Sequence, residues 1–359
     1  MNAVKPYLIM AGGTGGHVFP GLAVAQVLQS QGEHIVWLGS RAGMESKLIP
    51  ERGITFEALD VSGLRGKGIL KLLLAPFSLL RSIWQGAKIM RRYQPACVLS
   101  FGGFAAGPGG IAAWLLGKPL LVHEQNRIAG LTNRWLAKVA KQTLLGFSGA
   151  LPNARYVGNP VRADISAIAP PEQRFSDRTG PLQLLVMGGS LGARVLNEVV
   201  PKALALMPMA ARPLVRHQCG QRWHDETLKN YSDAKVSAEV SPFIADMAGA
   251  YANADVVLCR AGALTIAEVV AAGLFPIFIP YPHAVDDHQS ANARWLCEAG
   301  AAVLLPESEA SPERLQHILA GLNRPALLDA ANRNRSLAHP NCAANIAASA
   351  RALAAGSRS

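Results

Sequence analysis

Three glycine-rich segments of the sequence follow apolar runs of strand length and could bind an anion. They are residues 12–17 (GGTGGH), 101–104 (FGGF) and 188–192 (GGSLG). Glycine lets backbone N–H groups approach a ligand, and a following helix N-terminus adds partial positive charge. None of the three matches the P-loop pattern or the dinucleotide fingerprint. One such turn could equally be a tight connection with positive φ, but three together predict a phosphorylated ligand.

Two further features near these turns could carry chemistry. His17 follows the first turn, where a neutral imidazole could act as a general base. Thr265 and Glu268 form T-x-x-E at a predicted helix start, a spacing typical of a capping box. Alternatively, Glu268 could accept hydrogen bonds from both hydroxyls of a ribose. The residues by themselves leave both interpretations open.

The residue pattern favours neither a metal site nor a serine hydrolase. His123 and Glu124 do not form H-E-x-x-H, and Asp286 and Asp287 are adjacent instead of forming D-x-D. Ser190 is not part of G-x-S-x-G. The five cysteines lie far apart without a C-x-x-C pair, which is typical of a reducing compartment. We therefore expect no metal and no cofactor.

Short, continuously apolar runs alternate with helical stretches, as in parallel sheets covered on both faces. The runs predicted as strands are 7–10, 35–38, 97–100, 120–122 and 156–157, and then 182–187, 214–217, 236–240, 255–259, 276–279 and 302–305. Two such series predict an α/β fold with two doubly wound domains, and 165–181 is the expected linker. Ligands of these sheets bind beyond the carboxyl ends of the strands, where the glycine turns lie.

The charge is unevenly distributed along the chain. The 359 residues include 35 Lys and Arg and 24 Asp and Glu, but residues 1–163 contain 18 basic and only 6 acidic residues. The basic half is expected to attract a polyanion, which could be nucleic acid, a phosphorylated ligand or an anionic membrane. Half of the residues are hydrophobic and 16% are charged, so the chain is not intrinsically disordered.

Residues 69–92 predict an amphipathic helix with a break at Pro76. One apolar stripe is expected to face a core and consists of Ile69, Leu72, Leu79, Ile83 and Met90. A second stripe, flanked by basic residues, consists of Leu73, Phe77, Leu80 and Trp84. Two apolar sides with basic flanks predict docking to a membrane surface, and the alternative is a helix buried on both sides.

Together these motifs closely resemble the MurG family, the peripheral membrane glycosyltransferases that add N-acetylglucosamine (GlcNAc) to lipid I to make lipid II for peptidoglycan. The resemblance covers nearly the whole chain. Its most specific segments are 11–23, 61–68, 107–110, 123–133, 158–162, 188–193, 260–265 with Glu268, and 286–289 with Asn292 and Ala293.

The resemblance implies a GT-B fold, in which two Rossmann-like domains face a cleft. The expected domains are 1–163 for the acceptor and the membrane, 164–340 for UDP-GlcNAc, and a C-terminal helix within 341–359 that packs back on the first domain. The implied reaction is an inverting, metal-independent transfer to the C4 hydroxyl of the muramyl sugar (MurNAc) of lipid I, undecaprenyl-pyrophosphoryl-MurNAc-pentapeptide. The implied partners are both substrates, an anionic membrane surface and proteins of cell-wall synthesis and division, without nucleic acid. The implied location is the cytoplasmic face of the bacterial inner membrane.

Residue by residue, the resemblance implies a donor site, an acceptor site and a base. The donor residues are Thr14, Gly15, Gly16, Asn126, Arg162, Ser190, Ile244, Ala263, Leu264, Thr265, Glu268, His288, Gln289 and Asn292. Gly13, Gly102, Gly103 and Phe104 would contact the acceptor or its diphosphate. His17 is the expected base and Glu124 its rival. Many relatives have Tyr where this chain has Phe104, and some have Gln where it has His288.

Other functions fit parts of the pattern. The chain could be another GT-B transferase or a UDP-GlcNAc epimerase, and an epimerase would need neither a lipid acceptor nor a membrane face. A non-catalytic nucleotide-sugar sensor would bind the donor without turnover. An NAD-dependent dehydrogenase is disfavoured because its fingerprint is absent.

Overall fold

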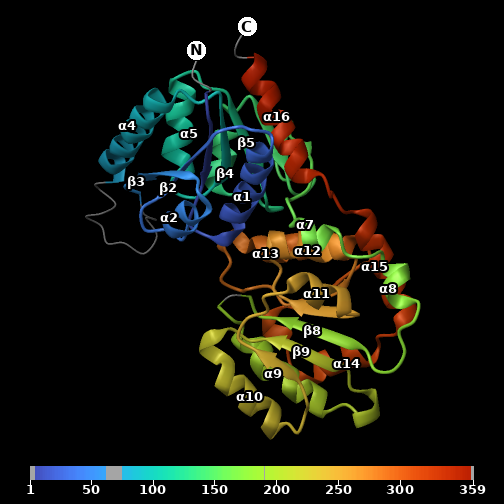
Figure 1. The fold of residues 1–359 in the computed structure, drawn as a ribbon. Coiled ribbons are helices and arrows are strands. Elements are labelled where there is room, and N and C mark those ends of the chain that lie inside the picture. Colours follow the sequence, from blue (N-terminus) through green and yellow to red (C-terminus); the bar gives the residue numbers. More distant parts are fainter. Residues whose placement is uncertain (1–4, 62–74, 190, 357–359) are drawn as a thin grey trace. The chain divides into compact units, whose positions relative to one another are not determined.

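The structure is a computed structural model that describes residues 5–61, 75–189 and 191–356. The chain divides into two compact units (Figure 1). Unit 1 consists of Met1–Pro160 and Asn341–Ser359, and unit 2 of Val161–Pro340. The first boundary falls three residues before the expected one.

Unit 1 is built on a seven-stranded sheet in which every pair of neighbouring strands is parallel, in the order β3-β2-β1-β4-β5-β6-β7. Its strands are β1 (Tyr7–Ala11), β2 (Ile35–Ser40), β3 (Thr55–Leu59), β4 (Cys97–Gly102), β5 (Leu120–Glu124), β6 (Gln142–Leu145) and β7 (Arg155–Tyr156). The sequence analysis missed β3 and β6. β3 is a partly exposed edge strand and β6 has only four residues, so neither shows a long apolar run.

Helices cover both faces of this sheet, and the side chains of β1 show why the strand is apolar throughout. The helices are α1 (Gly15–Ser30), α2 (Glu45–Leu48), α4 (Ala75–Tyr93), α5 (Ala106–Leu115), α6 (Leu131–Leu136) and α16 (Cys342–Gly356), with the 3-10 turn η1 (Pro50–Arg52). Ile9 packs into a core with α1 and α16, whereas Leu8 and Met10 pack into a second core with α4 and α5. α16 lies beside α1, so the end of the chain completes the core of unit 1 (Figure 1).

Unit 2 repeats the architecture with a six-stranded parallel sheet in the order β10-β9-β8-β11-β12-β13. Its strands are β8 (Gln183–Met187), β9 (Leu214–Gln218), β10 (Glu239–Ser241), β11 (Val256–Cys259), β12 (Phe275–Phe278) and β13 (Val303–Leu304). Its helices are α7 (Ala163–Ser166), α8 (Pro171–Phe175), α9 (Arg194–Ala205), α10 (His224–Asp233), α11 (Met247–Asn253), α12 (Ala263–Ala272), α13 (His288–Glu298), α14 (Pro312–Ala320) and α15 (Arg324–Ser336). Short 3-10 turns are η2 (Met209–Ala211), η3 (Gln221–Trp223), η4 (Val285–Asp287) and η5 (Glu307–Glu309). The predicted pair of doubly wound domains is confirmed.

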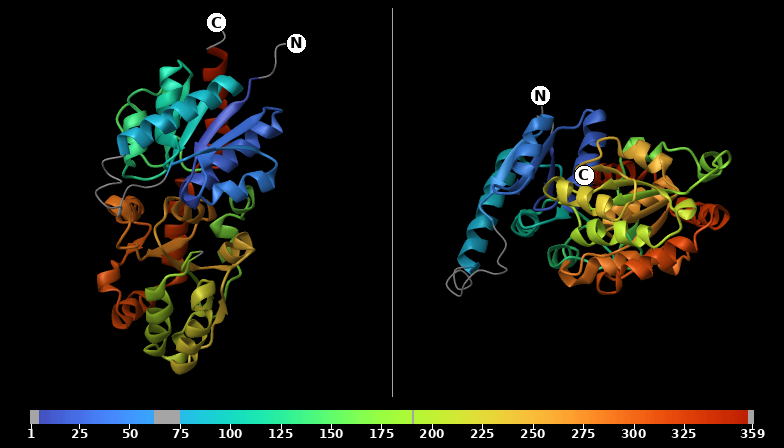
Figure 2. Two further views of the ribbon diagram at one scale, coloured as in Figure 1. Left: turned by 90° about the vertical axis from the view of Figure 1, so that its left-hand side faces the viewer. Right: turned by 90° about the horizontal axis from the view of Figure 1, so that it is seen from below.

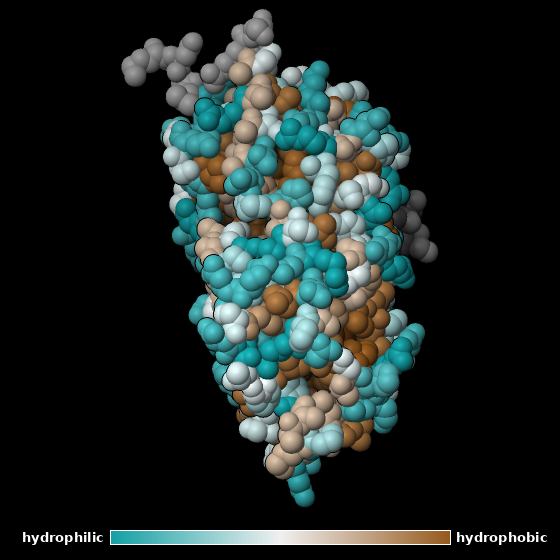
Figure 3. All heavy atoms as spheres, turned by 90° about the vertical axis from the view of Figure 1, so that its right-hand side faces the viewer, coloured by the Kyte–Doolittle hydropathy of each residue, from teal (hydrophilic) through white to brown (hydrophobic). Residues whose placement is uncertain are grey.

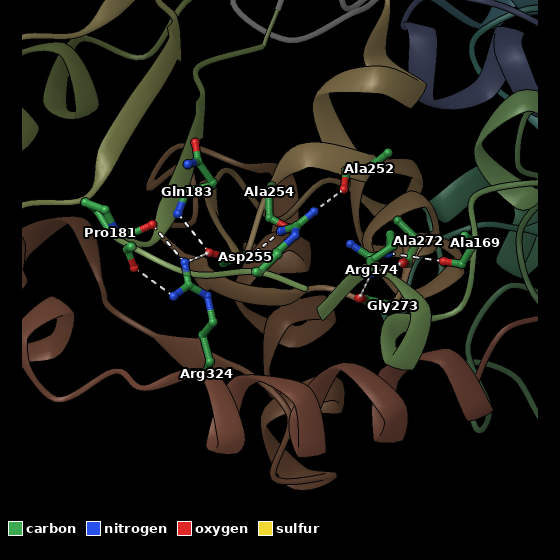
Figure 4. A network of polar contacts seen from close by, with 12 residues as sticks. Ala169, Arg174, Pro181, Gln183, Ala252, Ala254, Asp255, Ala272, Gly273 and Arg324 are labelled. Atoms are coloured by element: carbon green, nitrogen blue, oxygen red, sulfur yellow. Dashed lines mark hydrogen bonds and ion pairs between the residues drawn. The ribbon is translucent and has the colours of Figure 1, made fainter. Parts of the chain in front are cut away.

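The prediction of a linker at 165–181 is wrong, because this segment is anchored to unit 2. Arg174 donates hydrogen bonds to the carbonyl oxygens of Ala272 (2.8 Å) and Gly273 (2.6 Å) at the end of α12 (Figure 4). Arg178 donates to the carbonyl oxygen of Ala254 (2.9 Å) and forms an ion pair with Asp255. The content of proline, alanine and charged residues predicts a linker. In the structure, however, Arg174 and Arg178 of this segment donate hydrogen bonds to backbone carbonyl oxygens of unit 2.

Asp255 is the centre of this anchor and is fully buried. Its carboxylate pairs with Arg178 and, at 3.2 Å, with Arg324, and it accepts the backbone N–H of Gln183 at 2.9 Å (Figure 4). Two guanidinium groups and one N–H thus compensate a charge that would be costly to bury alone.

Helix α4 packs against α5 through small side chains. Its buried residues are Ser82, Gly86 and Met90, spaced four apart. At Gly86 a Cβ would lie 3.4 Å from that of Ala112 and 3.5 Å from the Gly109 Cα, so the two helices approach closely. Of the stripe expected to face the core, Met90 is buried and Ile83 is partly buried, but Leu79 is exposed. Ile69 and Leu72 lie outside the described residues. The buried face is therefore set by small residues, not by the largest apolar ones.

Large apolar side chains remain on the outer side of α4, which faces the viewer in Figure 2, left. Phe77, Leu80 and Trp84 are 71%, 64% and 61% exposed. Leu73 of the same predicted stripe lies outside the described residues. On the side turned away, the part of unit 1 seen in Figure 3 has hydrophobic residues separated by hydrophilic ones. Over the described part of the chain, none of the helices combines the length and apolarity that a membrane crossing requires.

We expect Asp255→Asn to lower the free energy of unfolding of unit 2 by about 3–5 kcal/mol, because two partly buried guanidinium groups lose their fully buried counter-charge. The matched control is Glu239→Gln, which breaks an exposed pair with Arg216 (3.1 Å) and should cost less than about 1 kcal/mol. Thermal or urea unfolding of both variants measures the difference. Equal, small losses would show that the Asp255 cluster does not anchor the segment.

Candidate functional site

The first glycine turn connects β1 to α1. On its inner side it contacts a buried glutamate, Glu45. Gly13 has φ +89°, a conformation that favours glycine. Its backbone N–H donates to Glu45 Oε2 at 3.2 Å. The expected contact of Gly13 with a diphosphate would therefore have to use another group. Thr14, Gly15 and Gly16 open α1, and no side chain caps the helix there.

His17 lies in the first turn of α1 and is partly buried. Its Nδ1 is 3.3 Å from the carbonyl oxygen of Gly12 and 3.4 Å from Thr14 Oγ1. A carbonyl can only accept, so the contact with Gly12 requires a proton on Nδ1. Nε2 is then the ring nitrogen that can take a proton, as a general base must.

The second glycine turn lies next to the first in unit 1. Gly102 and Gly103 have φ values of +100° and +93°. A Cβ at Gly102 would be 3.2 Å from His17 Nε2, and a Cβ at Gly103 would overlap the backbone of Gly12. Phe104 is exposed. The residues expected at the acceptor site are thus brought together around His17.

Glu124, the rival base, is buried at the end of β5 and uses both oxygens within the protein. Oε1 accepts from the backbone N–H of Asn126 (2.9 Å) and from its side-chain amide (3.3 Å). Oε2 accepts from the N–H of Gly130 (3.1 Å) and from the Asn133 amide (3.0 Å). Four donors occupy this carboxylate, so its geometry suits shaping the loop before α6 better than proton transfer.

His123 is a structural histidine. It is fully buried, and its Nε2 lies 3.0 Å from the carbonyl oxygen of Gly158. Gln125 approaches its Nδ1 at 3.1 Å. Burial lowers the pKa of His123 to about 4, so the imidazole is neutral near pH 7.

Unit 2 contains a cavity of about 190 Å³ beyond the carboxyl ends of its central strands. Three predicted donor residues line it: Ile244 after β10, and Thr265 and Glu268 on α12. The lining residues that the sequence analysis did not assign to the donor site are Met187, Gly189, Gln218, Phe243, Met247, Tyr251, Cys259 and Arg260. Gly189 belongs to the third glycine turn and Arg260 begins the segment 260–265, so for these two the motif itself was the available signal.

Glu268 is held at the wall of this cavity. Its Oε1 is 3.4 Å from Arg162 Nε, and its Oε2 accepts from the Tyr251 hydroxyl at 3.1 Å. Burial raises the pKa of Glu268, and the Arg162 guanidinium opposes this shift. The capping-box interpretation is wrong: α12 begins at Ala263, and its N-cap residue is Gly262.

The N-terminus of α12 is an open group of donors. Gly262 has no side chain to cap the helix, so Ala263, Leu264 and Thr265 present backbone N–H groups there. Gln289 Oε1 accepts the N–H of Ala261 (3.3 Å) and of Tyr281 (2.9 Å).

Asn292 braces the same loop from α13. It is buried, and its amide lies 3.4 Å from the Ala261 carbonyl oxygen. His288 begins α13 and is partly buried. The structure therefore brings two of the expected sugar-binding residues, Gln289 and Asn292, to the loop that leads into α12.

Two predictions about binding sites remain, one for the third glycine turn and one for metal ions. In the third glycine turn, Gly189 and Gly192 have φ values of +78° and +76°, and Ser190 lies outside the described residues. Across residues 5–61, 75–189 and 191–356, no three or more His, Cys, Asp or Glu side chains are grouped so that they could hold a metal ion.

Each unit has a parallel sheet with a glycine turn at a strand exit. Comparison with known proteins shows that this pair of domains is the GT-B fold of a glycosyltransferase. Residues 7–145 match the N-terminal domain of glycosyltransferase family 28, and residues 183–348 match its C-terminal domain. The chain belongs to this family.

Two curated relatives of the chain carry the same name. The chain is 52% identical, over 97% of its length and 98% of the relative, to a Cupriavidus pinatubonensis protein named UDP-N-acetylglucosamine–N-acetylmuramyl-(pentapeptide) pyrophosphoryl-undecaprenol N-acetylglucosamine transferase. A protein of the same name from Aromatoleum aromaticum is 52% identical over 98% of this chain and 99% of its own. MurG of Acinetobacter baumannii superposes with a TM-score of 0.89 at 41% identity, covering 97% of this chain and 99% of its own. A calicheamicin glycosyltransferase (TM-score 0.71, 14% identity, 98% and 99% covered) shares the fold.

We expect Arg162→Gln to make stability more sensitive to pH. A carboxyl whose folded pKa is raised above its unfolded value binds more protons when folded, so stability falls as pH rises through that window. Removing Arg162 raises the pKa of Glu268 further, and this widens the pH range between its unfolded and folded pKa over which stability is lost. The variant should therefore lose more stability than wild type as the pH rises from about 4.3, the ordinary pKa of a glutamate, toward neutrality.

Thermal unfolding across this pH range measures the effect. The control is the double variant Arg162→Gln/Glu268→Gln, which should remove the added pH dependence. If the stability of Arg162→Gln depends on pH as that of the wild type does, the ion pair with Arg162 does not stabilise the ionised form of Glu268.

Proposed function

We propose that this enzyme transfers GlcNAc from UDP-GlcNAc to the C4 hydroxyl of MurNAc in lipid I, giving lipid II. The observation that carries the proposal is a fixed carboxylate, Glu268, in a cavity next to the uncapped N-terminus of α12. A ribose with two neighbouring hydroxyls and a diphosphate fit these two features. The shared name of the 52% identical relatives supplies the identity of both substrates.

Unit 2 binds the donor in this proposal. The backbone at Ile244 recognises the uracil edge, and Glu268 accepts hydrogen bonds from the ribose hydroxyls. The N–H groups of Ala263, Leu264 and Thr265 bind the diphosphate, assisted by Arg162 and by Ser190, which lies outside the described residues. His288, Gln289 and Asn292 contact the sugar. The cavity of about 190 Å³ suits the nucleoside part of the donor.

Transfer is a single displacement at the anomeric carbon. The C4 hydroxyl of the acceptor gives its proton to His17 Nε2 while its oxygen forms the new bond to C1. The bond from C1 to the β-phosphate oxygen breaks, and its electron pair leaves with UDP. The backbone donors of α12 stabilise the charge that develops on this phosphate, a role that a metal ion fills in other transferases. Configuration at C1 is inverted.

Unit 1 carries the acceptor and the membrane contact in this proposal. The whole basic excess of the chain lies in residues 1–163. The exposed Phe77, Leu80 and Trp84 of α4 insert into the interface, and Lys88, 5.8 Å from the Trp84 ring centre, accompanies them. The enzyme then works as a peripheral protein on the anionic cytoplasmic face of the bacterial inner membrane, where the lipid acceptor resides.

The decisive assay is UDP release from UDP-GlcNAc in excess EDTA, with and without a short-chain lipid I analogue. We expect release that depends on the acceptor and survives EDTA. Acceptor-independent release would indicate hydrolysis or epimerase-type chemistry. Donor binding without release would indicate a sensor.

We expect His17→Ala to lower kcat by about 10²–10⁴-fold with little change in UDP-GlcNAc affinity, because the general base is lost. The matched control is His34→Ala, which removes an exposed histidine before β2 and should leave kcat unchanged. Steady-state kinetics measure kcat, and calorimetric titration with UDP-GlcNAc measures the donor affinity. A His17→Ala enzyme within a few-fold of wild type would exclude His17 as the base.

We expect Phe77→Glu/Trp84→Glu to weaken binding to anionic vesicles by at least about tenfold, because two exposed apolar side chains no longer insert. The control Met209→Glu/Leu228→Glu adds the same charge at exposed apolar positions of unit 2. Vesicle co-sedimentation measures binding, and circular dichroism verifies folding. Equal loss in both double variants would mean that net charge, not α4, controls binding.

A further inference from the structure

Glu45, at the start of α2, is a fully buried carboxylate that the proposed reaction does not yet use. Its Oε1 accepts from the Ser40 hydroxyl (2.7 Å) and the Ser40 backbone N–H (2.9 Å). Its Oε2 accepts from the backbone N–H of Gly13 at 3.2 Å. Each of these three groups donates, which is the pattern that suits an ionised carboxylate.

The surrounding backbone is built to admit this side chain. A Cβ at Gly12, at Gly39 or at Gly43 would overlap Glu45 atoms. Each of three segments therefore has a glycine where it contacts Glu45. These segments are the first glycine turn, β2 and the loop before α2. Such a cradle indicates a fixed position for the carboxylate.

The peptide unit between Gly12 and Gly13 joins Glu45 to His17. Its N–H, which belongs to Gly13, donates to Glu45 Oε2 at 3.2 Å. Its carbonyl oxygen, which belongs to Gly12, lies 3.3 Å from His17 Nδ1. A carboxylate on the N–H side of an amide polarises it, so the carbonyl oxygen becomes a stronger acceptor for the Nδ1 proton.

In serine proteases a carboxylate performs this task by direct contact: it holds the imidazole tautomer and stabilises the imidazolium. Here one peptide unit stands between the two groups. Thr14 Oγ1, at 3.4 Å from the same Nδ1, is a second neighbour of that proton. The Nδ1 proton stays in place throughout, and only Nε2 gains and loses a proton.

We propose that Glu45 is a positioning residue that acts through the Gly12–Gly13 peptide to keep His17 protonated on Nδ1 and ready to accept a proton on Nε2. This inference rests on the proposed role of His17 as the base. It explains why a carboxylate is buried beneath a turn that is proposed to face an anionic ligand. The carboxylate of Glu45 interacts with the Gly13 N–H from inside the protein, and the ligand contacts the outer side of the turn.

Glu45→Gln is the test variant. The glutamine side chain has one oxygen and one NH₂ group, so its NH₂ group must face at least one of the three groups that donate to Glu45. We expect kcat to fall by about 10–100-fold with little change in the KM for UDP-GlcNAc. In a His17→Ala background the same substitution should change kcat by less than about twofold, because the residue acts only through His17. Independent, multiplying losses would show that Glu45 merely supports the fold, and a Glu45→Gln enzyme with wild-type kcat would also overturn the inference.

The matched control is Glu57→Gln on β3, which removes the same charge from a partly buried carboxylate that accepts from the Tyr93 hydroxyl at 2.7 Å. It should leave kcat unchanged.

A spectroscopic readout separates this inference from the proposed reaction and needs no activity. In the ¹⁵N-histidine-labelled wild-type enzyme, long-range ¹H–¹⁵N correlations should show His17 as the Nδ1–H tautomer, and Glu45→Gln should shift the population toward Nε2–H. A wild-type Nε2–H tautomer overturns the inference even if the variant does not fold. If His17→Ala retains full activity, the proposed base fails, while the tautomer measurement still decides whether Glu45 governs His17.

Discussion

Buried carboxylates that accept backbone N–H groups hold the loops at the carboxyl ends of the strands in unit 1. Glu45 binds the N–H of Gly13, and Glu124 binds those of Asn126 and Gly130. An unpaired buried carboxylate would be costly, so each loop must keep the geometry that supplies its donors. The exposed side of each loop is thereby fixed before any substrate arrives. Such preorganisation suits a catalyst that stabilises charge without a metal.

The two units use one architecture for different tasks. In unit 1 the glycine turns lie next to His17, and their shape is set from inside by Glu45. In unit 2 the helix that follows β11 is left uncapped, and Glu268 on that helix faces a cavity. The proposed single displacement needs a base and a site that stabilises the departing diphosphate, and we infer that unit 1 supplies the base and unit 2 the diphosphate site.

The sequence predicted the strands that are buried on both faces, because such strands are continuously apolar, and it missed the exposed edge strand β3 and the short β6. It also predicted the glycine turns, which follow β1, β4 and β8, and it selected His17 and Glu268, whose roles stay predictions. It misjudged 165–181, where arginines bind distant carbonyl oxygens such as that of Gly273. Contacts of this kind depend on tertiary structure and leave no local pattern. Glu45 was missed for the same reason: only the folded chain brings it under Gly13.

The stereochemistry of the product tests the central claim of a single base-assisted displacement most directly. UDP-GlcNAc is an α-glycosyl phosphate, so attack by the C4 hydroxyl on the opposite face must give a β-linked disaccharide. We expect NMR spectra of the product, formed with a lipid I analogue in excess EDTA, to show only the β linkage at C4 of MurNAc. An α linkage would mean that the configuration at C1 is retained, which a single attack from the opposite face cannot give, and would contradict the role assigned to His17.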